Sequence, residues 1–160
     1  APDDPEVQAY IGRCYARKRE WDKSDEAFRN AIEAAKARDL PVWWLYRDWG
    51  HIRARFGHYE EARFHFDKAS AGNPFDPSII GSVAYMYWRQ GDDEMAAKCF
   101  EQALEINPCH EHSLTYYAKY LDSIGRNDEA KKWRDKLAAL ATSMEYAQPI
   151  EWDIDMEPEY

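Results

Sequence analysis

Two stretches decide the fold: RFGHYEEARFHFDKASAGNP, residues 55–74, and RQGDDEMAAKCFEQALEINP, residues 89–108. When Arg55 is aligned with Arg89, five distinctive residues of the two stretches coincide. The matched pairs are Gly57 with Gly91, Ala62 with Ala96, Phe66 with Phe100, Ala69 with Ala103, and Pro74 with Pro108. We call this constant offset the repeat period. Self-similarity at a fixed period of this length indicates an array of repeated units, each of which packs on its neighbours.

The repeat continues in both directions along the chain. One more repeat period leads from Ala96 to Ala130, whereas upstream the step from Phe28 to Phe66 is longer than the period. The first unit is therefore expected to carry about one extra helical turn near residues 34–39. We expect repeat units at about residues 5–41, 42–75, 76–109 and 110–148, the last with an elongated capping helix.

The repeated residues fit a unit of two helices joined by a tight turn. Glycine at position 57 tolerates the positive φ that a chain reversal needs, and the small Ala62 lets the paired helices approach closely. Phe66 fills the gap between neighbouring units, and Pro74 stops the second helix. Because no strand pattern competes within residues 5–148, an all-α fold is predicted.

These residues resemble the tetratricopeptide repeat family over about residues 5–142. The resemblance implies a right-handed superhelical solenoid of about four helix–turn–helix units, followed by an extended C-terminal tail. There are departures from the family pattern. Ser24 stands where a small Ala is usual, Arg53 where a Tyr is common, and Arg134 at the Phe position of the fourth unit, with Trp133 beside it. The first unit also has no glycine at its turn.

In this family the first helix of each unit lines a concave groove that binds extended peptides or partner helices. The candidate peptide-binding residues that the resemblance places in such a groove are Arg13, Arg17, Trp44, Arg47, His51, Arg55, Tyr85, Trp88, Arg89, His112 and Lys119. The full set of inward positions holds five Arg, one Lys and two His against two acids, which indicates a basic, aromatic-lined surface. Alternatively, solvated helix faces simply carry such charges, and the aromatic residues pack between units.

The end of the chain, residues 149–160, is an acidic and aromatic segment. In EWDIDMEPEY, residues 151–160, acids alternate with mainly apolar residues, and this alternation separates the two sides of an extended chain. The candidate ligand residues of this tail are Trp152, Asp153, Ile154, Asp155, Met156 and Tyr160. Two interpretations stay open, a solvated acidic terminus and a ligand for a groove.

Charge and composition narrow the class of protein. The net charge of −9 disfavours a general nucleic-acid binder. No apolar stretch is long enough for membrane insertion. The three cysteines form no paired framework, so an intracellular and cytoplasmic setting is expected.

The motif CHEH, residues 109–112, invites a metal-site interpretation. On a helix only Cys109 and His112 share a face, and two ligands are too few for structural zinc, which takes four. We interpret the motif as a polar helix start. Because the sequence has no phosphate-binding glycine loop, nucleophile elbow or HExxH stretch, we expect no catalytic residues, no metal, no cofactor and no enzymatic activity.

The leading hypothesis is a non-enzymatic adaptor or assembly factor that binds an acidic, partly apolar extended segment of a protein or peptide partner. Its own tail is a candidate ligand in cis or in trans, and exchange of tails between copies would cause self-association. One alternative is a scaffold subunit of a larger complex that uses its outer faces and anchors through its tail; exposed aromatic residues on those faces would favour it. Another is a specificity domain for a partner enzyme.

Overall fold

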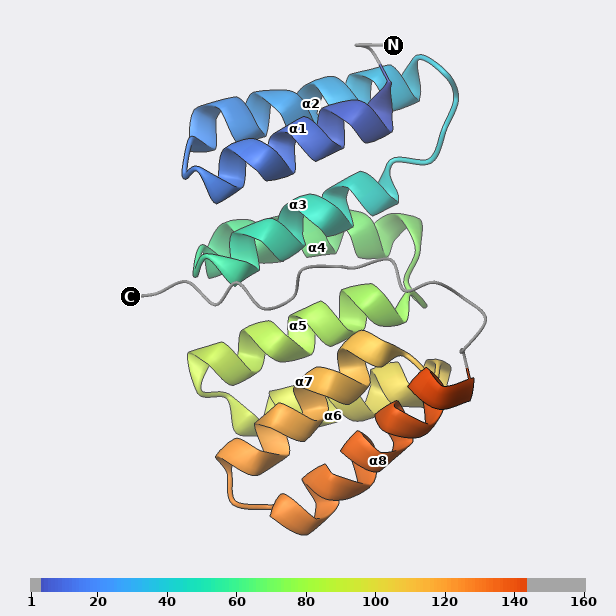
Figure 1. Ribbon diagram of the computed structural model, residues 1–160. Coiled ribbons are helices and arrows are strands. Elements are labelled where there is room, and N and C mark those ends of the chain that lie inside the picture. The colour runs from blue at the N-terminus through green and yellow to red at the C-terminus, as the bar shows by residue number, and fades with distance from the viewer. Residues whose placement is uncertain (1–3, 144–160) are drawn as a thin grey trace.

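The computed structural model describes residues 4–143. Within them all regular structure is helical: α1 (Pro5–Arg17), α2 (Trp21–Lys36), α3 (Trp43–Arg55), α4 (Tyr59–Gly72), α5 (Pro77–Gln90), α6 (Asp93–Ile106), α7 (Glu111–Ser123) and α8 (Asn127–Ser143). Figure 1 shows these helices as pairs stacked into an elongated array. The predicted all-α solenoid is confirmed. The predicted tail at 149–160 lies outside the described residues.

Each odd-numbered helix packs along the helix that follows it and also contacts the next odd-numbered helix. The helices α1, α3, α5 and α7 therefore form one continuous layer, visible at the front of Figure 1. The helices α2, α4, α6 and α8 form the second layer. A surface on either layer is built from parts of several units.

The core lies between the two layers, around one phenylalanine from each of the first three second helices. Phe28, Phe66 and Phe100 are fully buried, as are the aligned alanines of these helices. A Cβ atom added to Gly12 would lie 2.8 Å from the ring of Phe28, and one added to Gly50 would lie 2.8 Å from the ring of Phe66. Side chains larger than hydrogen would therefore push the paired helices apart.

The turns between paired helices share one backbone conformation even where the sequence differs. Gly57, Gly91 and Gly125 have φ values of 82°, 81° and 79°. In the first unit the corresponding position holds Arg19, whose φ is 60°. The first unit thus makes the left-handed turn without a glycine, although L-residues meet a steric penalty there.

Candidate functional site

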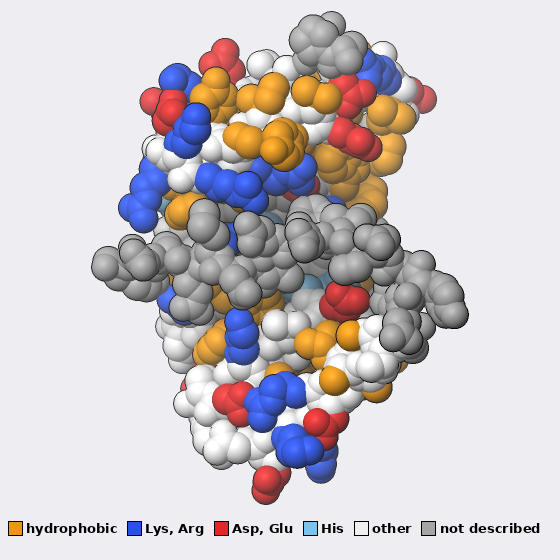
Figure 2. All heavy atoms as spheres, in the orientation of Figure 1, with side chains coloured by type: hydrophobic (Ala, Val, Ile, Leu, Met, Phe, Trp, Pro, Cys, Tyr) orange, Lys and Arg blue, Asp and Glu red, His pale blue; other side chains and the backbone are white. Residues whose placement is uncertain are grey.

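The predicted groove residues all lie on the layer of first helices. Arg13 and Arg17 belong to α1, and His112 and Lys119 to α7. The remaining ones are carried by α3 and α5. Figure 2 shows Lys and Arg side chains grouped on this face where α1 meets α3.

A series of linked ion pairs, which we call the ion-pair chain, runs across this layer from α1 over α3 to the start of α5. Nη1 of Arg13 lies 3.0 Å from Oδ2 of Asp48, and Nη2 of Arg47 lies 3.1 Å from the other oxygen of the same carboxylate. Nη1 of Arg47 also lies 3.3 Å from Oδ2 of Asp76. The Asp76 side chain is only 8% exposed, and its other oxygen accepts the backbone N–H of Ser78 and caps α5. Two predicted groove cations are therefore already paired within the chain.

A histidine cluster, defined as His51, His110 and His112, lies beside the ion-pair chain where α3, α5 and α7 meet. Nδ1 of His51 is 3.1 Å from Oγ of Ser82, and Nε2 of His110 is 3.1 Å from Oγ of Ser78. The ring of His112 lies 5.3 Å from that of His51 and 6.0 Å from that of His110. Nε2 of His112 is buried and has no hydrogen-bond partner among the described residues.

Burial lowers the pKa of all three imidazoles. A nearby carboxylate opposes this lowering of the pKa, Asp48 for His51 and Asp76 for His110. Positively charged arginines lower the pKa of both rings further. The pKa of His112 is lowered furthest, since the other two histidines add to the effect of burial. The three rings are consequently neutral near pH 7.

An aromatic shelf, defined as Tyr85, Trp88 and Tyr116, follows toward the C-terminal ends of α5 and α7. The rings of Tyr85 and Tyr116 are 5.0 Å apart at 68°, and those of Tyr85 and Trp88 are 6.0 Å apart at 84°. All three side chains are half-buried, and Nζ of Lys119 lies 5.5 Å from the centre of the Tyr116 ring. The rings thus pack between units and still present a face to the surface.

Two other predicted residues differ in setting. Arg17 is exposed in the last turn of α1. Trp44 is half-buried and packs against the core cluster of the first two units, which fits a packing role. The groove prediction missed Tyr116 and His110. Tyr116 aligns with Asp48 and Ser82 at the repeat period, and this alignment could have placed it on the same face.

Arg53, which the sequence marks as a departure from the family pattern, lies on α3 but faces the second layer. Its side chain is almost fully buried, with Nη2 2.6 Å from Oδ1 of Asp25 on α2 and Nη1 3.0 Å from Oε2 of Glu61 on α4. The guanidinium lies 4.8 Å from the centre of the Trp21 ring. This arginine clamp joins the first and second units.

Stacked helix pairs with a polar and aromatic layer of first helices define a helical-repeat interaction protein. A model of the tetratricopeptide repeat family matches residues 82–108, which cover most of α5 and all of α6. The repeat period and the fold extend this likeness to the tetratricopeptide repeat family beyond the matched residues.

Relatives of this chain are much longer proteins. It is 25% identical over 130 residues to anaphase-promoting complex subunit 3 of Schizosaccharomyces pombe, covering 81% of this chain and 19% of that protein. It is 27% identical over 103 residues to an N-terminal acetyltransferase A complex subunit-like protein of the same organism, covering 63% and 15%. The chain therefore spans less than a fifth of the length of these curated relatives.

Solved structures share the fold at low sequence identity. PilF of Pseudomonas aeruginosa superposes with a TM-score of 0.66 at 18% identity, over 86% of this chain and 61% of that chain. A mutant of MamA superposes with a TM-score of 0.54 at 20% identity, over 86% and 77%. Among the helices of residues 4–143, none has both the length and the apolar character that crossing a membrane requires.

Proposed function

We propose that the layer of first helices binds an acidic, partly apolar extended segment of a partner protein, so that the chain acts as a non-enzymatic adaptor or assembly factor. Tetratricopeptide repeat proteins act in protein–protein interactions or complex assembly. The observation that carries the proposal is the aromatic shelf, whose half-buried rings lie on the same layer as Arg55, Arg89 and Lys119.

An extended chain that alternates acids with apolar residues suits this layer. Its apolar side would cover the aromatic shelf, and its carboxylates would meet the guanidinium groups, whose planar fork donates two hydrogen bonds. Arg13 and Arg47 contribute less, because Asp48 and Asp76 already neutralise them. The exposed cations of the layer, such as Arg17 and Lys119, would add to the electrostatic attraction.

The chain's own tail at 149–160 has this chemistry and is our first candidate ligand. In an extended conformation the eleven residues 150–160 would span about 35 Å, enough to cross several units. Attachment to the same chain gives the tail a high effective concentration, so binding in cis would compete with other partners. Binding in trans would link copies of the chain head to tail.

A labelled peptide of residues 149–160 tests the proposal by fluorescence anisotropy. We expect the chain shortened at Gln148 to bind the peptide more tightly than the full chain, because the tail no longer competes. Raising the salt concentration from about 0.05 M to about 0.5 M should weaken the binding about tenfold as the charges are screened. The double variant Tyr85→Ala, Arg89→Glu should abolish binding, whereas Arg63→Glu on α4 should not. Salt-insensitive binding, or binding that survives the double variant, would contradict the proposal.

A second candidate is a scaffold subunit of a larger complex, and one observation favours it. Phe64 on α4 is 57% exposed and Phe75, between α4 and α5, is 74% exposed, so aromatic residues do lie outside the layer of first helices. Large exposed apolar side chains that gather in patches mark protein interfaces. In this case replacing both residues by Ser should release a co-purifying partner while leaving peptide binding intact.

A further inference from the structure

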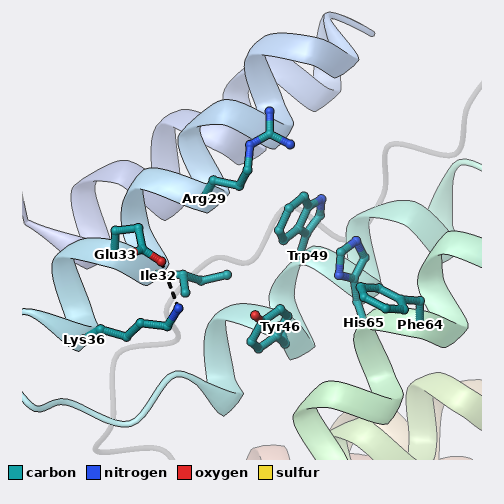
Figure 3. Close-up of a pocket in the computed structure, with 8 residues that line it drawn as sticks. All are labelled: Arg29, Ile32, Glu33, Lys36, Tyr46, Trp49, Phe64 and His65. Atoms are coloured by element: carbon teal, nitrogen blue, oxygen red, sulfur yellow. Dashed lines mark hydrogen bonds and ion pairs between the residues drawn. The ribbon is translucent and has the colours of Figure 1, made fainter.

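An outer cleft lies between the second helices of the first two units, with side chains of α3 also lining it. It has a volume of about 310 Å³ and is lined by Arg29 and Ile32 of α2, Tyr46 and Trp49 of α3, and Phe64 and His65 of α4. Figure 3 shows these side chains converging from the three helices. Four of the eight lining side chains carry rings, and a lining rich in rings is typical of a site for an apolar group.

Aligning the units at the repeat period shows which side chain occupies the equivalent space at another boundary between units. Two steps of the repeat period lead from Trp49 to Tyr117 and from His65 to Trp133. At the boundary between the third and fourth units, the Trp133 ring packs 5.5 Å from the ring of Tyr117, which is 3% exposed. At the first boundary the smaller imidazole of His65 stacks on Trp49 at 4.0 Å and leaves the outer cleft open. The chain therefore fills the equivalent space with an indole at one boundary and leaves it empty at the other.

The charge at the rim is also reversed between the two boundaries. The position of Arg29 corresponds to Glu101 in the third unit, where the carboxylate accepts a hydrogen bond of 2.8 Å from the hydroxyl of Tyr117. Nε1 of Trp49 instead donates to Asp25 at 3.0 Å. Within residues 4–143 Arg29 forms no ion pair or hydrogen bond. The neighbouring rim residue Lys36, in contrast, forms an ion pair with Glu33, with Nζ 2.8 Å from Oε1.

The cleft residue His65 also has a polar atom that lacks a partner among the described residues. Nδ1 of His65 is buried and accepts or donates no hydrogen bond, although the side chain is 7% exposed. Burial lowers the pKa of His65 to about 4, so the ring is neutral near pH 7. A buried polar group that is left unpaired costs free energy, and a ligand that supplies its partner removes that cost.

We propose that the outer cleft docks an aromatic side chain of a partner protein, tryptophan or tyrosine, that is adjacent to a carboxylate in the partner's sequence. The ring fills the space between Ile32 and Trp49 and covers the exposed Phe64. Its N–H or O–H group meets the imidazole of His65, and the carboxylate pairs with Arg29. This surface lies between α2 and α4, contains none of the predicted groove residues, and adds a second point of attachment on the same chain.

Ligand-observed NMR with the full chain tests the proposal, using the capped dipeptide amide N-acetyl-Trp-Asp as the probe and N-acetyl-Trp-Lys as the comparison. We expect saturation transfer to the indole protons of both probes and tighter binding of the acidic one. His65→Trp copies the residue found at the last boundary, so it should fill the cleft and weaken binding of both probes about tenfold. Arg29→Glu copies Glu101 and should shift the preference toward the lysine probe by about threefold in affinity.

The controls separate this surface from the groove. Lys98→Glu on α6 makes the same change of charge sign outside the cleft and should leave both affinities unchanged. The double variant Tyr85→Ala, Arg89→Glu, which tests the groove, should leave the affinities of both dipeptide probes unchanged, so failure here leaves the proposed function standing. Equal affinities of all variants for the acidic probe would overturn the proposal. So would chemical shifts of Trp49 that depend on protein concentration without any probe, since a second copy would then occupy the cleft.

Discussion

Replacing Arg53 by alanine is expected to lower the free energy of unfolding by about 3 kcal/mol. Arg53 is 5% exposed, and its guanidinium pairs with Asp25 and Glu61, which lie on different helices. Removal leaves the partly buried carboxylate of Asp25 without its counter-charge and also removes the stacking on Trp21. Urea unfolding of the two proteins, compared at pH 7, measures the difference.

Two further variants sharpen this test. Arg134→Ala breaks an exposed pair with Asp122 and should cost less than about 1 kcal/mol. Combining Arg53→Met with Asp25→Asn should recover part of the loss, because the unpaired charge disappears while an oxygen remains to accept the Trp49 indole N–H. If Arg53→Ala costs no more than Arg134→Ala, the clamp does not hold the first two units together.

Acidification is expected to destabilise the fold steeply below pH 6.5. Burial lowers the folded-state pKa of four histidines, His51, His65, His110 and His112. Below about pH 6.5 these histidines therefore bind protons in the unfolded chain and stay neutral in the folded one. The stability that these neutral rings provide is fully present above the unfolded pKa of about 6.5 and is lost as the pH falls toward the folded values. For His65 the loss extends down to a pH of about 4.

The slope of stability against pH measures this effect. Each histidine that is protonated only in the unfolded chain contributes about 1.4 kcal/mol per pH unit. Urea titrations between pH 8 and pH 4 should therefore show a free energy of unfolding that is first constant and then falls steeply with decreasing pH. His112→Phe should reduce the slope of this fall by the contribution of one proton, about 1.4 kcal/mol per pH unit. Tyr116→Phe alters a ring in contact with His112 without removing an imidazole, and it serves as the control. Equal slopes for the wild type and His112→Phe would contradict the role given to burial.

The fold could be predicted from the sequence because its determinants are local and repeated. A helix pair needs a small residue such as Ala62 and a large one such as Phe66 at fixed spacing, and comparing the chain with itself at the repeat period reveals both. The turn at Arg19 could not be recognised in this way. There the packing of α1 on α2 holds an unfavourable backbone conformation that the residue itself does not signal.

The surface was less predictable because it depends on which side chains meet across units. Arg13 and Arg47 read as free cations in the sequence, whereas the carboxylate of Asp48 lies between them. The histidine cluster brings together His51 and His110 from separate units, and no motif in the sequence connects them. The role of the tail in binding stays a prediction, since residues 149–160 lie outside the described part of the chain.

The ion-pair chain has a mechanical consequence. Arg13 links the first unit to the second through Asp48, and Arg47 links the second to the third through Asp76, whereas the last joint contains edge-to-face rings such as Tyr85 and Tyr116. Ion pairs therefore bridge the first two joints, the first of which also has ring contacts such as Phe28 on Trp49, whereas ring contacts such as Tyr85 with Tyr116 bridge the last joint. Added salt should weaken the ion pairs of the first two joints and leave the last joint unchanged. Small-angle scattering should therefore detect a salt-dependent change in the curvature of the helical array.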